Sequence, residues 1–267
     1  MTVPFDLDGA VAVLTGAGSG IGRATARSLA DRGARVAVSD VDTERAEETA
    51  ALVVTAGGEA IAVKVDVARQ SDLEDLRDRC LQRFGRVDVV FNNVGVIAMG
   101  APESLPIEAW QRMLDLNLLS IARSNLVFLP LLLAQGRGHV VNTASASGLL
   151  AYGFDRLPYV ASKHAVVGVT EALALYLGPK GIGVTCVCPS GVMTNIVEQI
   201  TFYGEAASPR APQHPVVDAD VVGELVADAV TAGTFLVVTA PEILDELRER
   251  ASDPEAYVQR MIKEQQP

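Results

Sequence analysis

AVAVLTGAGSGIG, residues 10–22, is the stretch that decides the fold of this 267-residue chain. Its first six residues form an apolar run typical of a strand buried on both faces, and a helical pattern over residues 21–32 follows. Glycine permits a tight turn and close approach of the backbone to a pyrophosphate, while the helix N-terminus supplies free N–H groups and a positive dipole end. We therefore predict a dinucleotide site formed by Gly16, Gly18, Ser19, Gly20, Ile21 and Gly22.

The rest of the chain repeats this rhythm of a short β-branched run followed by a longer helical pattern. Such alternation is typical of βα units around a mostly parallel sheet. The expected strands cover residues 10–15, 34–40, 60–66, 87–92, 138–144, 182–188 and 234–239, and the expected helices cover 21–32, 43–56, 70–84, 106–135, 159–178 and 218–232. The prediction is an α/β fold with one Rossmann-type, doubly wound parallel sheet of about seven strands and helices on both faces, in a single domain over residues 1–267.

Asp40 ends the second expected strand, at the distance from the glycine turn where an acid hydrogen-bonds the ribose diol of adenosine. A carboxylate there repels a 2′-phosphate, and Ser19 offers no cation to neutralise one, so the sequence favours NAD over NADP. A solvated strand end, or a cap for the helix that starts near Thr43, is the alternative role for Asp40.

Further candidate contacts stand at the ends of the third and fourth expected strands. Open α/β sheets bind ligands at the carboxyl ends of their strands. We expect Asp66 and Val67 to reach the edge of the adenine, and the NNVG segment at 92–95 to add polar groups and a glycine that permits close approach. The contacts expected there are Asp66, Val67, Asn92, Asn93 and Gly95.

Composition narrows the class of protein. The net charge is −11 and the pI about 4.8, and Lys and Arg are scattered, so the sequence argues against nucleic-acid binding. The longest apolar run, 124–134, contains Pro130 and is too short for a membrane span, and the N-terminus lacks the layout of a signal peptide. Three cysteines cannot all pair and suit a reduced compartment. We expect a soluble, cytoplasmic protein.

No metal site is expected. Cys186 and Cys188 fall on one face of an expected strand, but no further soft ligand is near them in sequence, which favours core packing. His139, His164 and His214 have no metal-ligand spacing and are expected to be ordinary packing or surface residues.

Tyr159 and Lys163 stand four residues apart in YVASK, residues 159–163, and so lie on one side of a helix, one turn apart. An ammonium close to a phenol favours phenolate, which lowers the tyrosine pKa from about 10 toward the range of a general acid/base. The pair predicts proton chemistry at this helix.

Together these features resemble the short-chain dehydrogenase/reductase family, over about residues 7–240. The motifs are TGAGSGIG at 15–22, NNVG at 92–95, Asn117, NTASASG at 142–148, YVASK at 159–163 and PSGVMT at 189–194. The resemblance implies Tyr159 as general acid/base, Lys163 as its pKa partner and nicotinamide-ribose ligand, Ser145 as the group orienting the substrate oxygen, and Asn117 as holder of a water in the proton relay. Further cofactor contacts are implied at Pro189, Val192 and Thr194.

The sequence departs from the family pattern in several places. The separation between Ser145 and Tyr159 is one residue longer than usual, so Ser147 remains a second candidate for the catalytic serine; the S-x-x-G spacing to Gly148 favours Ser145. Val94 and Ser190 replace the usual alanine and glycine of their motifs. The glycine-bearing stretch common at the end of family tetramers is replaced by a helical extension over residues 241–267, with a charged helix from Glu242 to Arg250.

Residues 194–217 mix apolar anchors with prolines and are too long for an ordinary connector, which favours a substrate lid over a disordered segment. An apolar wall with one reacting corner suits a hydrophobic secondary alcohol or its ketone. Arg156 or Arg210 could instead grip a carboxylate. The expected walls comprise Val96, Ile97, Met99, Leu149, Leu150, Tyr152, Phe154, Ile196, Ile200, Phe202 and Tyr203.

The function predicted is NAD-dependent interconversion of a secondary alcohol and its ketone by hydride transfer, without a metal. A non-catalytic NAD-binding sensor or scaffold protein, and a relative of the epimerase or dehydratase type, are the alternatives. The expected assembly is a homodimer through the helix over 159–177, or a tetramer, although the same apolar stripe suits simple burial. Its members are Ala161, Ala165, Val169, Ala172 and Leu173.

Overall fold

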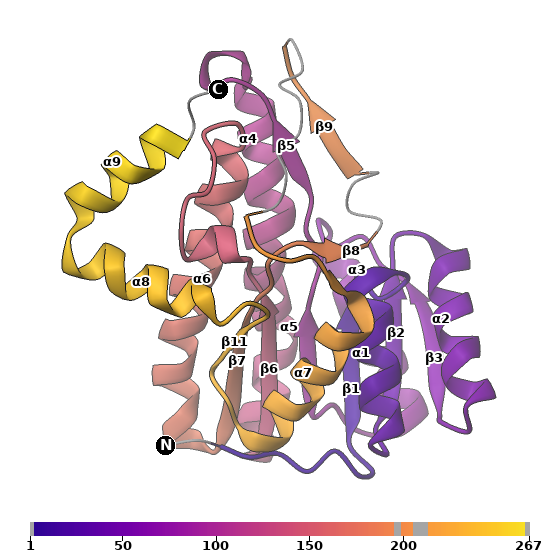
Figure 1. Cartoon of the computed structure of the whole chain (residues 1–267). Helices are drawn as coiled ribbons and strands as arrows, with labels where there is room; N and C mark the ends of the chain where they lie inside the picture. The colour runs from indigo at the N-terminus through magenta and orange to yellow at the C-terminus, as the bar shows by residue number, and fades with distance from the viewer. Residues whose placement is uncertain (1–2, 195–198, 205–212, 265–267) are drawn as a thin grey trace.

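The structure is a computed structural model that describes residues 3–194, 199–204 and 213–264 (Figure 1). A seven-stranded parallel sheet runs through its centre, in the order β11-β7-β6-β4-β1-β2-β3. The strands are β1 (Val11–Thr15), β2 (Arg35–Asp40), β3 (Ala60–Lys64), β4 (Val89–Asn92), β6 (Gly138–Thr143), β7 (Ile182–Cys188) and β11 (Leu236–Val238). Every strand lies within or at the edge of a predicted one, and the doubly wound α/β fold is confirmed.

The strand order reverses direction at β1, which lies between β2 and β4. From β1 the chain first moves outward to β2 and β3, and then returns to the other side to form β4, β6, β7 and β11. Thr15 is in register with Asn92, and Asn92 with Asn142, so the three strands end side by side. Loops that leave neighbouring strands in opposite directions open a crevice at such a reversal point, and ligands bind there.

Helices cover both faces of the sheet. One layer holds α1 (Gly20–Asp31), α2 (Thr43–Thr55) and α7 (Ala219–Ala232), which pack on the sheet through one large apolar cluster. The other holds α3 (Gln70–Phe84), α5 (Ser120–Gln135) and α6 (Leu157–Leu177), which close a second cluster. The four strands β1, β4, β6 and β7 are buried along their whole length, because each has helices on both of its faces.

The predicted helix over 106–135 is three consecutive pieces. The chain forms α4 (Ile107–Leu114), a π-helical turn (Asp115–Leu119) and α5. A π-turn inserts one extra residue into the helical path and often marks a functional site. The apolar periodicity runs unbroken through this region, so it gave no sign of the turn, which contains Asn117.

The C-terminal extension forms two helices, α8 (Glu242–Ser252) and α9 (Pro254–Glu264), drawn in yellow at one side of the sheet in Figure 1. Their buried side chains, Ile243, Tyr257 and Met261, pack with Ala146 and Leu150 in a separate apolar cluster. The extension therefore covers the segment that follows β6.

Two very small parallel sheets were not predicted, because strands of two or three residues carry no readable alternation. β5 (Ile97–Met99) pairs with β9 (Ile200–Phe202), and β8 (Val192–Met193) pairs with β10 (Val217–Asp218). Both lie beyond the carboxyl ends of the main strands and connect segments about 25 or 100 residues apart in sequence.

By length and composition, two helical stretches of the described chain could cross a membrane: 107–135 and 157–180. The first stretch is longer than the apolar run 124–134, because α4, the π-turn and α5 follow one another without a break. Both stretches pack on the sheet through buried side chains, among them Phe128, Leu132, Val166 and Leu177. They are core helices of the doubly wound fold.

Candidate active site

A cleft of about 1820 Å³ lies at the carboxyl ends of β1, β4 and β6. Pockets for a single drug-sized ligand usually measure about 300–1,000 Å³, so this cleft has room for a dinucleotide and a small substrate side by side. Predicted site residues from both halves of the chain line it: Gly16, Ser19, Gly20, Ile21, Asp40, Asp66, Val67, Asn93, Gly95, Val96, Ser145, Tyr152, Tyr159, Lys163, Pro189, Val192, Thr194 and Ile200.

The glycine turn has no room for side chains, which leaves its backbone open to a dinucleotide. A Cβ on Gly22 would lie 2.2 Å from the Gly16 carbonyl oxygen, so this glycine lets α1 start against the turn. Gly20 has a φ of +50°, and a Cβ on it would crowd Thr194 at 2.9 Å. The Asn93 amide donates to the Gly16 oxygen at 3.0 Å and fixes the turn from β4. The cradle is bare backbone at the N-terminus of α1, as an anionic pyrophosphate requires.

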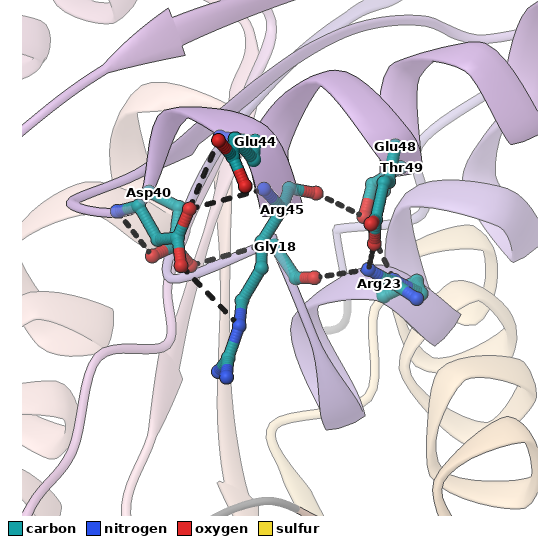
Figure 2. A network of polar contacts seen from close by, with 8 residues as sticks. Gly18, Arg23, Asp40, Glu44, Arg45, Glu48 and Thr49 are labelled. Atoms are coloured by element: carbon teal, nitrogen blue, oxygen red, sulfur yellow. Dashed lines mark hydrogen bonds and ion pairs between the residues drawn. The ribbon is translucent and has the colours of Figure 1, made fainter.

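Asp40 is fixed at the end of β2 by two backbone donors (Figure 2). The Gly18 N–H donates to one carboxylate oxygen at 3.0 Å, and the Asp42 N–H donates to the other, also at 3.0 Å. Asp42, and not Asp40, caps α2, since its side chain accepts from the N–H groups of Glu44 and Arg45. The helix-cap role considered for Asp40 is therefore wrong, because that position is taken by its neighbour.

The cations around this corner are paired. Arg23 donates to the Gly18 carbonyl oxygen at 2.6 Å and forms an ion pair with Glu48 at 2.9 Å, and Arg45 lies 3.4 Å from a carboxylate oxygen of Asp42 (Figure 2). Asp40 lines the cleft at the end of β2, and both of these arginines have other acidic partners.

The remaining predicted cofactor residues divide into those that line the cleft and those that shape it. Gly18 and Gly22 belong to the turn, and Asn92 lies inside the sheet, where its amide donates to the Asn142 side chain at 2.8 Å. Asp66 lines the cleft, and its carboxylate accepts from the Ala68 N–H at 3.0 Å. A Cβ on Gly95 would lie 3.1 Å from Lys163 Nζ, so this glycine gives the lysine its space.

Tyr159 and Lys163 face the same cleft from the first turns of α6, and both are almost fully buried. Lys163 Nζ donates to the Thr143 carbonyl oxygen at 2.8 Å and lies 5.9 Å from the centre of the Tyr159 ring. The predicted juxtaposition is present, and the backbone of β6 holds the ammonium in place.

The electrostatics of the pair differ from the prediction. Burial is the largest influence on Tyr159 and raises its pKa; a hydrogen bond with Ser145 and the charge of Arg156 oppose this rise. Burial also lowers the pKa of Lys163 to about 8. The expectation that Lys163 sets the Tyr159 pKa was wrong for the protein alone, since desolvation outweighs the attraction of an ammonium that is itself buried.

Ser145, and not Ser147, is among the groups that lower the pKa of Tyr159. It directly precedes a short helical turn, Ala146–Gly148, and its hydroxyl oxygen accepts from the Ser147 N–H at 3.1 Å. Both serines line the cleft. The geometry favours Ser145 as the group facing the substrate oxygen, with the backbone of Ser147 orienting it.

Asn117 uses its side chain to join three segments. Its oxygen accepts from the Val96 N–H at 2.9 Å, and its amide nitrogen donates to the Val96 carbonyl oxygen at 3.1 Å and to Ser162 Oγ at 3.0 Å. Ser162 in turn donates to the Tyr159 carbonyl oxygen at 2.8 Å. The side chain therefore ties the π-turn to β5 and to the first turn of α6, and positions Tyr159.

The predicted substrate walls are only partly assembled. Val96, Ile97, Met99, Tyr152 and Ile200 line the cleft. Five others do not: Leu149 and Leu150 pack against α8 and α9, Phe154 and Phe202 are 46% and 44% exposed, and Tyr203 packs beside α4. Ile196 and Arg210, with half of the proposed lid, lie outside the described residues.

Several residues of the site were not predicted. They include Thr143, whose carbonyl oxygen receives Lys163, and Ser162, which links Asn117 to α6. His214 and Glu264 also line the cleft. A backbone acceptor such as the Thr143 carbonyl oxygen cannot be recognised from the amino-acid sequence. Ser162 belongs to the YVASK motif, but the sequence does not show that Asn117 is its partner.

The cysteines pack as predicted. Cys186 and Cys188 are fully buried in β7, with their sulfur atoms 3.7 Å apart. His139 is buried too, and its Nε2 lies 2.8 Å from Thr185 Oγ1. Within the ranges that the structure describes, no three His, Cys, Asp or Glu side chains come together as metal ligands.

A doubly wound parallel sheet, a glycine turn at its reversal point and a buried Tyr–Lys pair on the far side of the cleft define a nucleotide-binding oxidoreductase. The family model for short chain dehydrogenase matches residues 10–202. The chain belongs to the short-chain dehydrogenase family.

Known relatives agree with this assignment. The chain is 39% identical over 191 residues to cyclohexanol dehydrogenase of Acinetobacter sp. (strain SE19), covering 71% of this chain and 75% of the relative. It is 35% identical over 193 residues to D-beta-hydroxybutyrate dehydrogenase of Rhizobium meliloti (strain 1021), covering 70% and 73%. The solved structure of a short chain dehydrogenase/reductase from Burkholderia phymatum in complex with NAD superposes with a TM-score of 0.84 at 34% identity, over 94% of this chain and 96% of that one. A nicotinamide cofactor therefore fits this fold and cleft.

Proposed function

We propose that the protein oxidises a hydrophobic secondary alcohol with NAD, or reduces the corresponding ketone with NADH, with Tyr159 as general acid/base. One observation carries the proposal: Tyr159 and Ser145 line the same cleft as the glycine turn and Lys163. Similarity to a cyclohexanol dehydrogenase and to a D-beta-hydroxybutyrate dehydrogenase supports a secondary alcohol as substrate.

The protein's own groups act on the substrate oxygen and its proton. In alcohol oxidation the Tyr159 phenolate removes the hydroxyl proton, and in ketone reduction the phenol returns one. The Ser145 hydroxyl donates to the same oxygen and stabilises its developing negative charge. When bound, the nicotinamide ring supplies the chemistry of hydride exchange with the carbinol carbon.

Lys163 and Asn117 support this pair. We infer that the positively charged Lys163 ammonium, held in the cleft by the Thr143 carbonyl oxygen, binds the nicotinamide ribose. Its own pKa of about 8 means that it carries this charge fully only at neutral pH and below. Asn117 fixes the first turn of α6 through Ser162, so we infer a positioning role for its side chain.

The cofactor is NAD in preference to NADP. Asp40 supports this, because its carboxylate borders the cleft at the end of β2 and is held there by two backbone donors. A 2′-phosphate at that corner would meet a fixed negative charge, whereas a ribose diol would meet an acceptor.

The two alternative functions have less support. A sensor or scaffold protein would have no use for Tyr159, Lys163 and Ser145 facing one cleft. Similarity to a cyclohexanol dehydrogenase and to a D-beta-hydroxybutyrate dehydrogenase favours alcohol oxidation over the epimerase or dehydratase type.

We also propose that the molecule is a homodimer through the outer faces of α5 and α6. Leu126 and Leu175 are 67% and 76% exposed there, and the predicted stripe on α6 is partly exposed at Ala161 and Ala172. Sedimentation velocity decides between a monomer and a dimer.

The decisive experiment is a screen of secondary alcohols with NAD, read as NADH absorbance, on wild-type protein and two matched variants. Tyr159→Phe removes the proton acceptor, and we expect turnover to fall about a thousandfold while NAD binding by titration stays close to wild type. Tyr176→Phe, an exposed tyrosine on the same helix, should leave turnover unchanged. Retention of most activity by Tyr159→Phe would overturn the mechanism.

A further inference from the structure

Tyr152, His214 and Glu246 come from three separate segments and meet at one wall of the cleft. His214 Nε2 lies 3.2 Å from the Tyr152 hydroxyl oxygen and 3.3 Å from a Glu246 carboxylate oxygen, and the rings of Tyr152 and His214 meet edge to face. The charge of Glu246 also acts on Tyr152. Tyr152 and His214 both line the cleft. The mechanism proposed above uses none of the three.

The arrangement fixes the hydrogen-bonding capacity of His214. Its side chain is 8% exposed, and Nε2 faces a carboxylate oxygen, which only accepts. Nε2 therefore carries the proton when the ring is neutral, and Nδ1 is the acceptor. Among the described residues no hydrogen bond reaches Nδ1 of His214.

Tyr152 keeps its proton. Burial and the charge of Glu246 both raise its pKa, so the phenol stays neutral. The cleft wall therefore offers a phenol oxygen and an imidazole nitrogen in one place, backed by a carboxylate that orients both. Such a pair suits a neutral group that donates and accepts hydrogen bonds, which a hydroxyl does.

The surroundings of this polar cluster are apolar and firmly packed. Tyr152 packs against the cluster of Leu150, Ile243, Tyr257 and Met261, so that α8, which carries Glu246, lies against the segment after β6. The hydroxyl of Tyr257, buried in the same cluster, has no hydrogen-bond partner within the described ranges. Tyr257 Oη and His214 Nδ1 are therefore two polar atoms of this region without a hydrogen bond among the described residues.

We propose that Tyr152 and His214, oriented by Glu246, bind a second hydroxyl group of the substrate, remote from the carbinol that reacts at Tyr159. The inference rests on the proposed function and narrows its substrate class to diols and hydroxyketones on an apolar skeleton. A carboxylate at that position is disfavoured, because it would approach the charge of Glu246.

The first test measures kcat/KM for matched six-membered rings: cyclohexanol, 4-methylcyclohexanol, and the 1,2-, 1,3- and 1,4-cyclohexanediols. A methyl group has nearly the size of a hydroxyl but cannot hydrogen-bond, so the ratio of diol to methyl substrate isolates the polar contact. We expect wild-type protein to prefer one of the diols by about tenfold, the discrimination of a hydrogen bond in a partly open site. Tyr152→Phe and Glu246→Gln should bring that ratio close to one, while Tyr176→Phe keeps the wild-type ratio.

The outcomes separate recognition from a structural role. If Tyr152→Phe and Glu246→Gln lower kcat/KM for all rings by the same factor, the cluster only ties the segment before β10 to α8, and the proposal is wrong. An equal preference for diol and methyl rings in the wild type also overturns it.

A binding measurement keeps this test independent of turnover. Dissociation constants of the diols and of 4-methylcyclohexanol are measured by calorimetry on the inactive Tyr159→Phe protein saturated with NAD. Tighter binding of one diol, lost in Tyr159→Phe/Tyr152→Phe, supports the second hydroxyl site. If the wild type oxidises no alcohol, the proposed function fails, and the dissociation constants alone decide the inference, which equal values would contradict.

Discussion

The buried surroundings of Tyr159 disfavour the phenolate that its role as a general base requires. Burial raises its pKa, while Ser145 and Arg156 lower it, so the tyrosine depends on several neighbours and not on one lysine. Arg156 lies three residues earlier, lines the cleft and is held by Asp155 at 2.8 Å. A general base must be deprotonated to work, so alcohol oxidation should rise with pH and ketone reduction should fall.

Arg156 provides a test of this balance. Arg156→Gln removes a positive charge that lowers the Tyr159 pKa, so the rise of kcat/KM for oxidation should shift to higher pH and activity at neutral pH should decrease. Arg156→Lys keeps the charge and should restore most of the profile. The pH profiles of wild type and both variants provide the check, with thermal unfolding measured alongside because Asp155 loses its partner. An unshifted profile in Arg156→Gln would show that the charge does not act on the general base.

Asp40 makes a second residue-scale prediction. Wild-type protein should use NAD at least about tenfold more efficiently than NADP, equivalent to about 1.4 kcal/mol. Asp40→Ala should narrow this preference and weaken NAD binding, because the Gly18 N–H also loses its acceptor. Measuring kcat/KM for both cofactors on one alcohol tests this; equal efficiencies in the wild type would contradict it.

At the scale of elements, the pairing of β5 with β9 decides which of the predicted lid residues line the cleft. Ile97 lies opposite Ile200, and both line the cleft, whereas Phe202 at the far end of the same strand is 44% exposed. The sequence made Ile200 and Phe202 equal candidates, and the structure separates them.

Ile200→Ala should therefore raise KM for a bicyclic secondary alcohol about threefold to tenfold, from the loss of about 1 kcal/mol of apolar contact, and change KM for propan-2-ol less. Phe202→Ala, on the same strand, should change neither by much. Steady-state kinetics on the two alcohols provide the measurement. A larger effect of Phe202→Ala than of Ile200→Ala would mean that the substrate contacts the other end of β9.

At the scale of the whole molecule, the C-terminal extension is part of the stable fold. Ile243 is fully buried against the segment after β6, next to the loop that holds Ser145. Helices α8 and α9 thereby link the packing of the chain's end to the substrate side of the cleft.

Ile243→Ala should reduce the free energy of unfolding by about 2–5 kcal/mol, since it leaves a cavity in this cluster. Ile262→Ala is the matched control on α9, where Ile262 is 49% exposed, and its effect should stay within about 0.5 kcal/mol. Urea unfolding of both variants compares them. Equal stabilities would indicate that the extension is not packed on the domain in solution.

The sequence by itself determined the sheet, the glycine turn and the Tyr–Lys pair. Each depends on neighbours close in the chain: apolar runs for buried strands, glycines between a strand and a helix, and a four-residue spacing on one helix face. Their physical causes are local, so residues such as Gly22 and Lys163 could be placed before any contact was known.

Only the tertiary structure decided the groups that act on those residues. Asn117 joins Val96 and Ser162, Lys163 reaches the Thr143 carbonyl oxygen, and His214 meets Tyr152, across separations of 20 to 62 residues. Burial, which raises the pKa of Tyr159, likewise depends on everything packed around the side chain. A hydrogen bond or a loss of solvent between distant segments leaves no periodic trace in the sequence, because the fold as a whole creates it.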